Sequence, residues 1–593
     1  MKQEICLLQE EMAARGIDIC LVPTSDPHQS EYVNPHFQAR RYLSGFTGSA
    51  GTLIVTRTEA AQWADGRYFL QAEQQLAGSG ITLMRLNQPG VPSTLEYVKR
   101  MLPDGGRIAC DGRVISASFG KKLARIAKEK GGKLCTDEDL VDAVWKDRPV
   151  LTSRPIWRLK ECYAGVSAGK KIADVRAAMS RYSAEIHILS SLDDIAWLLN
   201  LRGGDIACNP VFFSFLILSQ EEAILYAFPE AMSPEIDAYL EELGVTVRPY
   251  SDFYEETARL SRGRRVLADT EKTSWRLLTA LSGAAAVLDT PDPTAQSKAV
   301  KNETEIRCLR ESHRKDGAAM VNFIYWLKNT VGKEPLTEIS ASDHLEALRR
   351  EQGAIDLSFD TIAGYGPHGA IIHYTATPET DVPLEPSGLL LVDSGGHYLE
   401  GTTDITRTIA LGPVTEEEKT DFTLVLRGAI DLAMARFPKG ATGATLDVLA
   451  RMPLWERGLD YRHGTGHGIG YLLNVHEGPQ QINWQHRGRR PAAPIVPGMV
   501  TSDEPGYYPA GEHGIRTENE LLCVPFTETE YGEFYAFEVL TLCPIEREAI
   551  VPKMLTEAER EWLNAYHRRV YEEIGPRVAP EVKGWLMEVT EEI

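Results

Sequence analysis

The sequence predicts a multidomain protein that combines α/β and α+β domains. Its 593 residues exceed what one hydrophobic core usually holds, since domains typically contain about 100–200 residues. In the first half, short apolar or β-branched runs alternate with Gly and Asp turns and with helical stretches, which is typical of α/β domains. The second half places strand-like runs with unusual polar residues between long amphipathic helices, a pattern that favours an α+β domain.

The composition is that of a globular protein and argues against nucleic acid and membranes as partners. Hydrophobic residues make up 43% and charged residues 25% of the chain, close to the globular average. With 63 Lys and Arg against 84 Asp and Glu, the net charge of −21 repels nucleic acid and anionic lipid. No stretch approaches the roughly 20 apolar residues that cross a bilayer, and we see no signal peptide. Nine scattered cysteines without a C-x-x-C pair favour reduced thiols, so we expect a cytoplasmic protein.

Two successive α/β domains are predicted over residues 1–150 and 151–303. The early segment GTLIVTRTEAAQWADGRYFLQAEQQL contains strand, turn, strand and helix in that order. The later segment LDDIAWLLNLRGGDIACNPVFFSFLILSQEEAILYAF orders an apolar helix end, a Gly-rich turn, a long strand, an acidic turn and another strand. Because the two patterns are alike, we interpret the second domain as a repeat of the first.

A third domain is predicted over residues 304–593, with a C-terminal extension from residue 531 onward. The Pro-rich stretch LDTPDPTAQSKAVKN at 288–302 is expected to be a linker, because proline disfavours both helix and strand. A long helix is predicted for ETEIRCLRESHRKDGAAMVNFIYWL, whose apolar residues recur every three or four positions. Thr415 and Glu418 predict a capping box that starts a further helix.

Two aspartates mark neighbouring strands in SGLLLVDSGGHYLEGTTDITRTIAL. Asp393 ends an apolar run typical of a buried strand, and Asp404 is predicted inside a second strand beyond a Gly-rich turn. Taken singly, each aspartate fits an ordinary turn or hydrogen-bonding residue. Together they require a proton, a basic partner or a metal, because buried carboxylates repel each other and each costs several kcal/mol when unpaired.

Three histidines and two glutamates follow in glycine-rich surroundings. In YRHGTGHGIGYLLNVHEGP, His463, His467 and His476 lie among glycines that let the backbone approach a ligand. In PGMVTSDEPGYYPAGEHGIRTENELLCV, Glu504 follows one predicted strand and Glu518 is predicted on the strand after a Gly-rich turn. A lone histidine is usually structural, but a cluster flanked by glycine favours metal binding or acid–base chemistry.

Four carboxylates and one imidazole make an oxygen-rich set of metal ligands. Such a set suits Mn²⁺, Co²⁺, Fe²⁺ or Zn²⁺ better than a thiolate site does. Two divalent ions would balance the four negative charges. Two metals about 3.5–4 Å apart can share a hydroxide and polarise a carbonyl, as amide hydrolysis requires.

The motifs VDSGGHYLEGTTDITRT, HGTGHGIG, DEPGYY and GIRTEN resemble the pita-bread metallopeptidases, the family of methionine aminopeptidase, prolidase and aminopeptidase P. The chain is most similar to the cytosolic three-domain aminopeptidases P, and ARRYLSGFTGSAGTLIVT and WLNAYHRRVYEEIGP extend the likeness toward both ends. The resemblance implies two creatinase-like α/β domains followed by a pita-bread catalytic domain. It implies as metal ligands Asp393, Asp404, His467, Glu504 and Glu518, all of which are present.

The same resemblance assigns roles to residues around the metals. His373, in GAIIHYTA, and His476 would contact the substrate and stabilise the developing oxyanion. His463 would shape the substrate pocket, and Arg516 would orient ligand carboxylates. Arg67, in ADGRYF, would contact longer peptides.

The implied activity is that of an Xaa-Pro aminopeptidase, which hydrolyses the N-terminal residue from peptides with proline in second position. A hydroxide bridging two metals would attack the carbonyl, with Glu504 accepting a proton from the parent water. The resemblance further implies manganese as the metal, a homodimer and a cytoplasmic location. Residues 480–498 are longer and more basic than the family pattern, so we expect a surface loop there that affects the preference for peptide length.

Other functions stay open on the sequence alone. A prolidase would use the same metals but cleave only dipeptides, although the duplicated α/β domains and the C-terminal extension favour aminopeptidase P. A non-catalytic binding relative would lack several of the five ligands, which are intact here. A methionine aminopeptidase is disfavoured, because such chains are shorter and lack two preceding α/β domains.

Overall fold

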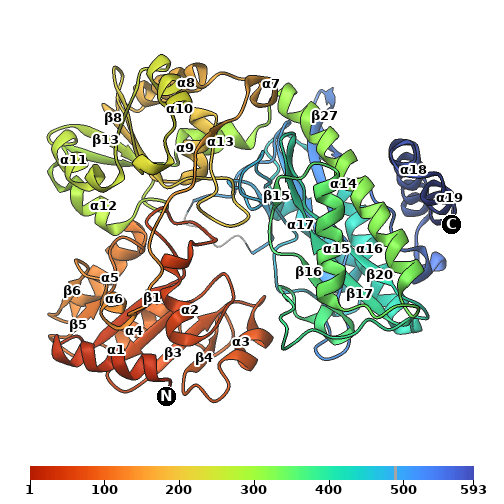
Figure 1. Cartoon of the computed structure of the whole chain (residues 1–593), viewed down its shortest axis with the longest axis horizontal. Helices are drawn as coiled ribbons and strands as arrows, with labels where there is room; N and C mark the ends of the chain where they lie inside the picture. The colour runs from red at the N-terminus through yellow and green to blue at the C-terminus, as the bar shows by residue number, and fades with distance from the viewer. Residues whose placement is uncertain (486–489) are drawn as a thin grey trace. The chain divides into compact units, whose positions relative to one another are not determined.

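The computed structural model describes residues 1–485 and 490–593, which form two units (Figure 1). Unit 1 comprises Met1–Glu161 and Val166–Ala295, and unit 2 comprises Cys162–Gly165 and Gln296–Ile593. The division into three domains stays a prediction. The surface loop predicted at 480–498 lies partly outside the described residues.

Unit 1 contains two six-stranded sheets with the same topology, in the orders β4-β3-β2-β1-β5-β6 and β12-β11-β10-β8-β13-β14. Strand β1 pairs antiparallel with β2 and parallel with β5, as β8 does with β10 and β13. The prediction of α/β domains is therefore confirmed. The strands are β1 (Ile19–Pro23), β2 (Thr52–Thr56), β3 (Ala60–Ala64), β4 (Thr82–Arg85), β5 (Arg107–Ala109), β6 (Lys133–Cys135), β8 (Ile186–Leu189), β10 (Ser214–Leu218), β11 (Ala223–Ala227), β12 (Val245–Pro249), β13 (Arg265–Ala268) and β14 (Ala286–Asp289).

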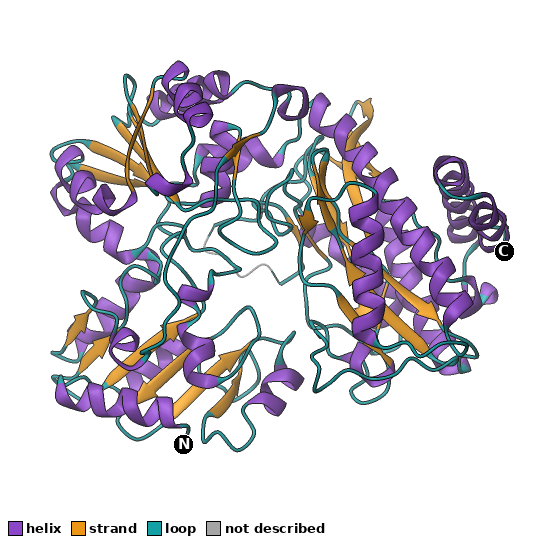
Figure 2. Cartoon of the chain, in the orientation of Figure 1, coloured by secondary structure: helices purple, strands orange, loops and turns teal. Residues whose placement is uncertain are grey.

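Helices flank the sheets of unit 1 (Figure 2) because the strands alternate their side chains between two faces. In β1, Val22 packs into the core that contains residues of α1 (Gln3–Ala14). Its neighbour Leu21 packs into a different core, which contains residues of α5 (Ala117–Glu129). Both faces of this sheet are thus buried, as the continuous apolar run in β1 predicts.

The segment at 288–302 differs from the irregular linker that the sequence predicts. The end of β14 opens this segment, and helix α13 (Pro293–Ala299) follows. Pro293 occupies the first position of α13, where the missing N–H leaves no helical hydrogen bond unmade and the fixed φ suits the helix. The prolines here mark the start of a helix.

Unit 2 packs long helices against small antiparallel sheets. Capping boxes begin two of these helices: the predicted one of Thr415 and Glu418 at the start of α16, and a second one, of Asn302 and Glu305, at the start of α14. One core joins α14, α16 and α18 to β17, β20 and β27. The elements used below are α14 (Glu303–Thr330), α15 (Glu338–Glu351), α16 (Glu416–Ala433), α17 (Gly443–Trp455), α18 (Glu557–Ile574), β16 (Ile362–Tyr365), β17 (Leu389–Ser394), β20 (Ile405–Ala410), β22 (Gly466–His467), β24 (Val500–Asp503), β26 (Ile515–Arg516), β27 (Asn519–Thr529) and β28 (Gly532–Val539).

In the described parts of the chain, no helix combines the length and apolar character needed to span a membrane. All nine cysteines are free thiols, and five of them, Cys20, Cys110, Cys308, Cys523 and Cys543, are buried.

Candidate metal centre

The predicted aspartate ligands lie at the ends of two paired strands in unit 2. Asp393 belongs to β17, which pairs antiparallel with β20 so that Asp393 lies opposite Thr406. Asp404 immediately precedes β20 and does not lie inside a strand as predicted. The hydrogen-bonded ladder between β17 and β20 ends at Ile405, so Asp404 lies just outside it. The antiparallel register still brings the carboxylates of Asp393 and Asp404 to the same end of these two strands.

The predicted glutamates flank a second antiparallel pair. Glu504 follows β24, and Glu518 precedes β27, so it lies beside the predicted strand and not on it. Asp503 pairs with Asn519 at the end of this ladder, which places the two glutamates next to each other. The amide of Glu518 also donates to the carbonyl of Thr406 at 3.1 Å, and this bond joins the second pair to β20.

Glycine lets the strand that carries His467 approach β24 closely. A Cβ on Gly466 would lie 2.0 Å from the carbonyl oxygen of Ser502, and a Cβ on Gly468 would lie 2.0 Å from that of Glu477. Any larger residue would push His467 away from the carboxylates. The two glycines of HGTGHGIG therefore allow backbone segments to approach each other, whereas the predicted approach to a ligand stays a prediction.

Three of the predicted ligands converge tightly. Nε2 of His467 lies 3.4 Å from Asp404 Oδ2 and 3.5 Å from Glu504 Oε1. Asp404, His467 and Glu518 each offer a ligand atom, and these atoms lie within 4.8 Å of one another. Nδ1 of His467 contacts the carbonyl of Gly468 at 3.0 Å, which turns Nε2 toward the acids.

Hydrogen bonds from neighbouring side chains hold the acids in place. Arg516 Nη2 donates to Asp393 Oδ2 at 2.5 Å, and Thr406 Oγ1 donates to Glu518 Oε2 at 2.7 Å. Ser502 Oγ donates to Glu504 Oε1 at 3.1 Å. The role predicted for Arg516 stays a prediction, and its bond to Asp393 is consistent with it. Thr406 and Ser502 were not singled out, because small hydroxyl residues in strands carry no signal of their own.

A tyrosine missed by the sequence analysis connects two predicted site residues. The hydroxyl of Tyr508 accepts from Arg516 Nη1 at 2.8 Å and lies 3.0 Å from Nε2 of His463. Tyr508 is the last residue of the motif DEPGYY, and its place in that motif is the sequence signal that could have identified it as a site residue.

Burial and crowding shift the titration of the predicted ligands. Burial, opposed by the hydrogen bond with His467 and reinforced by the charge of Asp393, raises the pKa of Asp404 to about 6. Burial and the charge of Asp404 also raise the pKa of Glu518 well above its ordinary value. Burial lowers the pKa of His467, but its contact with Asp404 and the charge of Glu504 outweigh burial and raise that pKa to about 9. Without cations, protons therefore offset the negative charge of this cluster.

The cluster fits divalent cations. Among the described residues, no donor reaches the buried Oδ1 of Asp393, and such an atom is costly unless it binds something. The donors are carboxylate oxygens and one imidazole nitrogen, which suit first-row divalent metals. Four carboxylates in one cluster also match the charge of two such ions.

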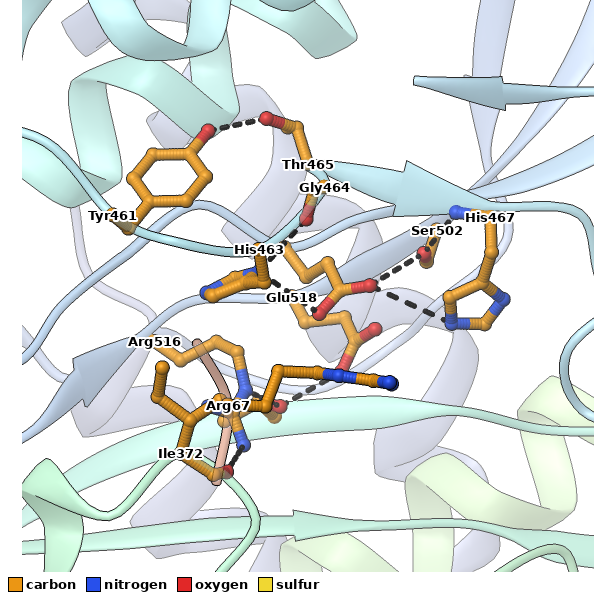
Figure 3. A network of polar contacts seen from close by, with 12 residues as sticks. Arg67, Ile372, Tyr461, His463, Gly464, Thr465, His467, Ser502, Arg516 and Glu518 are labelled. Carbon is orange, nitrogen blue, oxygen red and sulfur yellow. Dashed lines mark hydrogen bonds and ion pairs between the residues drawn. The ribbon is translucent and has the colours of Figure 1, made fainter. Parts of the chain in front are cut away.

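The predicted histidines lie around the ligand set. The ring of His476 stands edge-on to that of His467, with centroids 4.3 Å apart. Nδ1 of His463 contacts the carbonyl of Gly464 at 2.7 Å and lies 3.9 Å from Glu504 Oε2 (Figure 3). His373 follows Ile372, whose carbonyl accepts from Arg516 Nη2 at 3.5 Å.

Arg67 lies apart from these residues in the chain, in unit 1. Its Nε and Nη2 donate to the two carboxylate oxygens of Asp65 at 2.9 and 2.8 Å, and Glu31 lies 4.0 Å from Nη1. Its predicted contact with longer peptides stays a prediction.

Comparison with known families divides the chain in the same order as the fold. Residues 5–144 and 147–305 each match the Creatinase/Prolidase N-terminal domain. Residues 307–525 match metallopeptidase family M24, and residues 533–593 match the C-terminal region of that peptidase. Two creatinase-like domains followed by a pita-bread domain are thereby established.

Full-length relatives agree with this assignment. The chain is 40% identical over 613 residues to a probable Xaa-Pro aminopeptidase P from Paracoccidioides brasiliensis, covering 100% of this chain and 99% of the relative. It is 42% identical over 581 residues to one from Botryotinia fuckeliana, covering 95% and 88%. A solved X-prolyl aminopeptidase from Caenorhabditis elegans, described as a cytosolic enzyme with a di-nuclear active site, aligns at a TM-score of 0.95 with 32% identity over 100% of this chain and 99% of its own. The chain therefore belongs to metallopeptidase family M24 and is a hydrolase of the Xaa-Pro aminopeptidase P group within it.

Proposed function

We propose that this chain removes the N-terminal residue from peptides with proline in second position, using two divalent ions held by the five-ligand cluster. The observation that carries the proposal is the convergence of Asp404, His467 and Glu518, with ligand atoms within 4.8 Å of one another. The full-length likeness to Xaa-Pro aminopeptidases P supports the substrate class.

The residues that would hold the two ions are Asp393, Asp404, His467, Glu504 and Glu518. Such ions would supply a water of lowered pKa and would polarise the carbonyl that this water attacks. Glu504 accepts the proton from that water. Its side chain is 18% exposed, against 5% for Asp404, so water reaches Glu504 more readily than it reaches the deeper aspartate. The proton then passes to the proline nitrogen as the bond to it breaks.

The surrounding histidines act on the substrate. His373 and His476 donate hydrogen bonds to the oxygen on which negative charge develops, which favours the transition state over the bound peptide. His463, held by Tyr508 and the Gly464 carbonyl, shapes the pocket beside Glu504. Arg516 contacts Asp393 and fixes the direction of that ligand.

Proline makes a dedicated site necessary. An X-Pro bond has no N–H on its nitrogen, and the ring fixes φ near −65°. A peptidase that recognises that N–H, or that needs another φ, handles such a bond poorly.

The remaining parts of the proposal concern metal, assembly and location. Manganese fits a set of carboxylates with one imidazole. The cytosolic description of the C. elegans relative supports a cytoplasmic location for this chain. We also propose that the chain forms a homodimer, which sedimentation velocity would test.

We further propose that Arg67 contacts longer peptides. Arg67→Ala is then expected to raise KM for a pentapeptide more than KM for a tripeptide.

The substrate class is tested with three matched peptides. The Mn²⁺-loaded chain is expected to release arginine from Arg-Pro-Pro and to leave Arg-Ala-Pro intact. Cleavage of Gly-Pro without cleavage of Arg-Pro-Pro would identify a prolidase. Failure on all three peptides under Mn²⁺, Co²⁺ and Zn²⁺ would point to a binding protein.

A further inference from the structure

The segment that carries His373 is short and irregular. It runs from the end of β16 through the single 3-10 turn η5 (Gly366–Ala370) into the loop at 371–375. His373 is half-buried between two buried neighbours, Ile372 and Tyr374. A loop without strand or helix hydrogen bonds needs side-chain contacts to hold one conformation.

A single buried carboxylate supplies most of these contacts. Glu338 is fully buried at the first position of α15. Its Oε1 accepts from the backbone N–H of Tyr365 at 2.8 Å and lies 2.9 Å from Nδ1 of His368. Its Oε2 accepts from the hydroxyl of Tyr374 at 2.8 Å. All three partners lie within residues 365–374, the segment that contains His373.

The carboxylate of Glu338 is not needed to start its own helix. Thr337 and Ser340 already form a capping box there, with the Thr337 side chain accepting from the Ser340 N–H and Ser340 bonding back. A buried carboxylate costs several kcal/mol unless it is fully hydrogen-bonded. The hydrogen bonds that Glu338 makes to the loop therefore explain why its carboxylate is buried, whereas the start of α15 does not.

The loop also contacts the segment that carries Gly514 and Arg516. The carbonyl of Ile372 accepts from Arg516 Nη2 at 3.5 Å (Figure 3), and the same guanidinium binds Asp393. A Cβ on Gly514 would lie 1.7 Å from the carbonyl oxygen of Gly369, so the backbones pack directly on each other there. His373 thus lies between a residue bonded to Arg516 and a residue bonded to Glu338.

We propose that Glu338 is a positioning residue of the peptidase, which holds Tyr374, His368 and the Tyr365 amide and thereby fixes His373 toward the substrate. This inference rests on the proposed function, because it gives His373 a substrate to contact. Glu338 acts through His373 and touches no reacting atom. Its carboxylate determines where the donor for the developing oxyanion stands.

The test combines kinetics with hydrogen exchange on the full-length, Mn²⁺-loaded chain. Glu338→Gln keeps the side-chain volume but replaces one acceptor oxygen with an NH₂ group, so that either the Tyr374 hydroxyl or the Tyr365 amide loses its acceptor. We expect kcat on Arg-Pro-Pro to fall about ten- to hundredfold, with metal content unchanged and amide exchange across 365–374 accelerated. In a His373→Ala background, the same substitution should change kcat by less than about twofold, because the residue through which it acts is gone.

Two further variants separate positioning from general loss of stability. Tyr374→Phe removes one donor and leaves Glu338 two partners, so it should show a milder form of the same pattern even if Glu338→Gln folds poorly. Glu559→Gln alters another buried carboxylate, which caps α18 and binds Arg427, and should leave both kcat and exchange across 365–374 unchanged.

Unchanged exchange across 365–374 in Glu338→Gln would overturn the proposal. An equal loss of kcat with and without His373 would also overturn it. If the wild-type chain cleaves no X-Pro peptide, the proposed function fails, and the exchange measurement alone then decides whether Glu338 holds the segment.

Discussion

At the scale of single residues, Arg516 joins the candidate metal centre to its surroundings. Its guanidinium is almost fully buried and contacts Asp393, Thr406 Oγ1 at 3.1 Å and the Tyr508 hydroxyl. A planar fork with several donors can reach three acceptors at once, whereas a lysine ammonium offers one point of charge. The position therefore requires arginine for its shape as well as its charge.

Arg516→Lys is expected to weaken Mn²⁺ binding about 10- to 100-fold, since Asp393 loses the partner that orients it. We expect kcat to fall together with the affinity for Mn²⁺. Calorimetric titration of the metal-free chain with Mn²⁺ measures the change, and Arg427→Lys, which alters an arginine bound to Glu559, is the matched control. Equal affinity in wild type and Arg516→Lys would show that Asp393 needs no such partner.

At the scale of elements, a buried ion cluster ties the end of α13 to the loop that follows His476. Lys301 Nζ donates to Glu477 Oε1 at 2.6 Å, and Lys298 Nζ lies 3.5 Å from Glu477 Oε2. All three side chains are buried. Removing Glu477 would leave the buried Lys301 ammonium without the carboxylate that balances its charge in a medium of low polarity.

Glu477→Met is expected to lower the free energy of unfolding by about 3–5 kcal/mol for this reason. Urea unfolding of unit 2 in the full-length chain, followed by tryptophan fluorescence, measures the loss. Lys439→Met, which breaks an exposed pair with Glu533, should leave the midpoint unchanged. A Glu477→Met midpoint equal to that of wild type would mean that the cluster adds nothing to stability.

His567 in α18 makes the stability of unit 2 depend on pH. Its Nε2 accepts from the N–H of Ile545 at 3.1 Å, and burial, together with the charges of Arg407 and Arg547, lowers its pKa from 6.5 to about 3. As the pH falls below 6.5, His567 becomes protonated in the unfolded chain but stays neutral in the folded chain until the pH nears 3. The stabilisation that the neutral His567 provides is therefore fully present above pH 6.5 and is lost as the pH falls toward 3.

The contribution of His567 amounts to about 1.4 kcal/mol per pH unit inside that window. His567→Gln retains an acceptor for Ile545 but does not titrate. Urea unfolding at pH 7.5, 6 and 5 should therefore show a steeper decline for wild type than for the variant. Parallel declines would contradict the lowered pKa.

The sequence singles out acids and a histidine that the structure brings together, but it does not single out the residues that support them. Asp393, Asp404 and the glycine-flanked His467 stand out because carboxylates and histidines are unusual beside buried strands. Glu338 and the Lys301–Glu477 pair give no such signal, because Glu338 contacts a segment about thirty residues away and Lys301 lies 176 residues from its partner. The helix α13 was missed because proline was interpreted as a breaker when it occupies a first helical turn.

At the scale of the whole molecule, we expect metal binding to stabilise one unit only. All five predicted ligands come from unit 2, between β17 and the start of β27. A ligand that binds the folded state stabilises it by about 2.7 kcal/mol at a hundred times its Kd. The two sheets of unit 1 contribute no predicted ligand.

Saturating Mn²⁺ is therefore expected to slow amide exchange in unit 2, most strongly around residues 389–410, 465–476 and 500–518, and to leave the two sheets of unit 1 unchanged. Exchange mass spectrometry of the full-length chain with and without Mn²⁺ makes this comparison. Magnesium, which fits an imidazole-containing site poorly, is the control ion. Equal protection of both units would show that the centre involves unit 1.

The central claim is that five residues hold two ions for cleavage of an X-Pro bond, and reconstitution tests it most directly. The chain is stripped with chelator and titrated with Mn²⁺, and release of arginine from Arg-Pro-Pro is measured beside metal content for wild type and Glu504→Gln. We predict that wild-type activity rises with metal to saturation at two ions per chain, and that Glu504→Gln folds yet stays inactive. Full activity in the stripped chain, or in Glu504→Gln, would contradict the account.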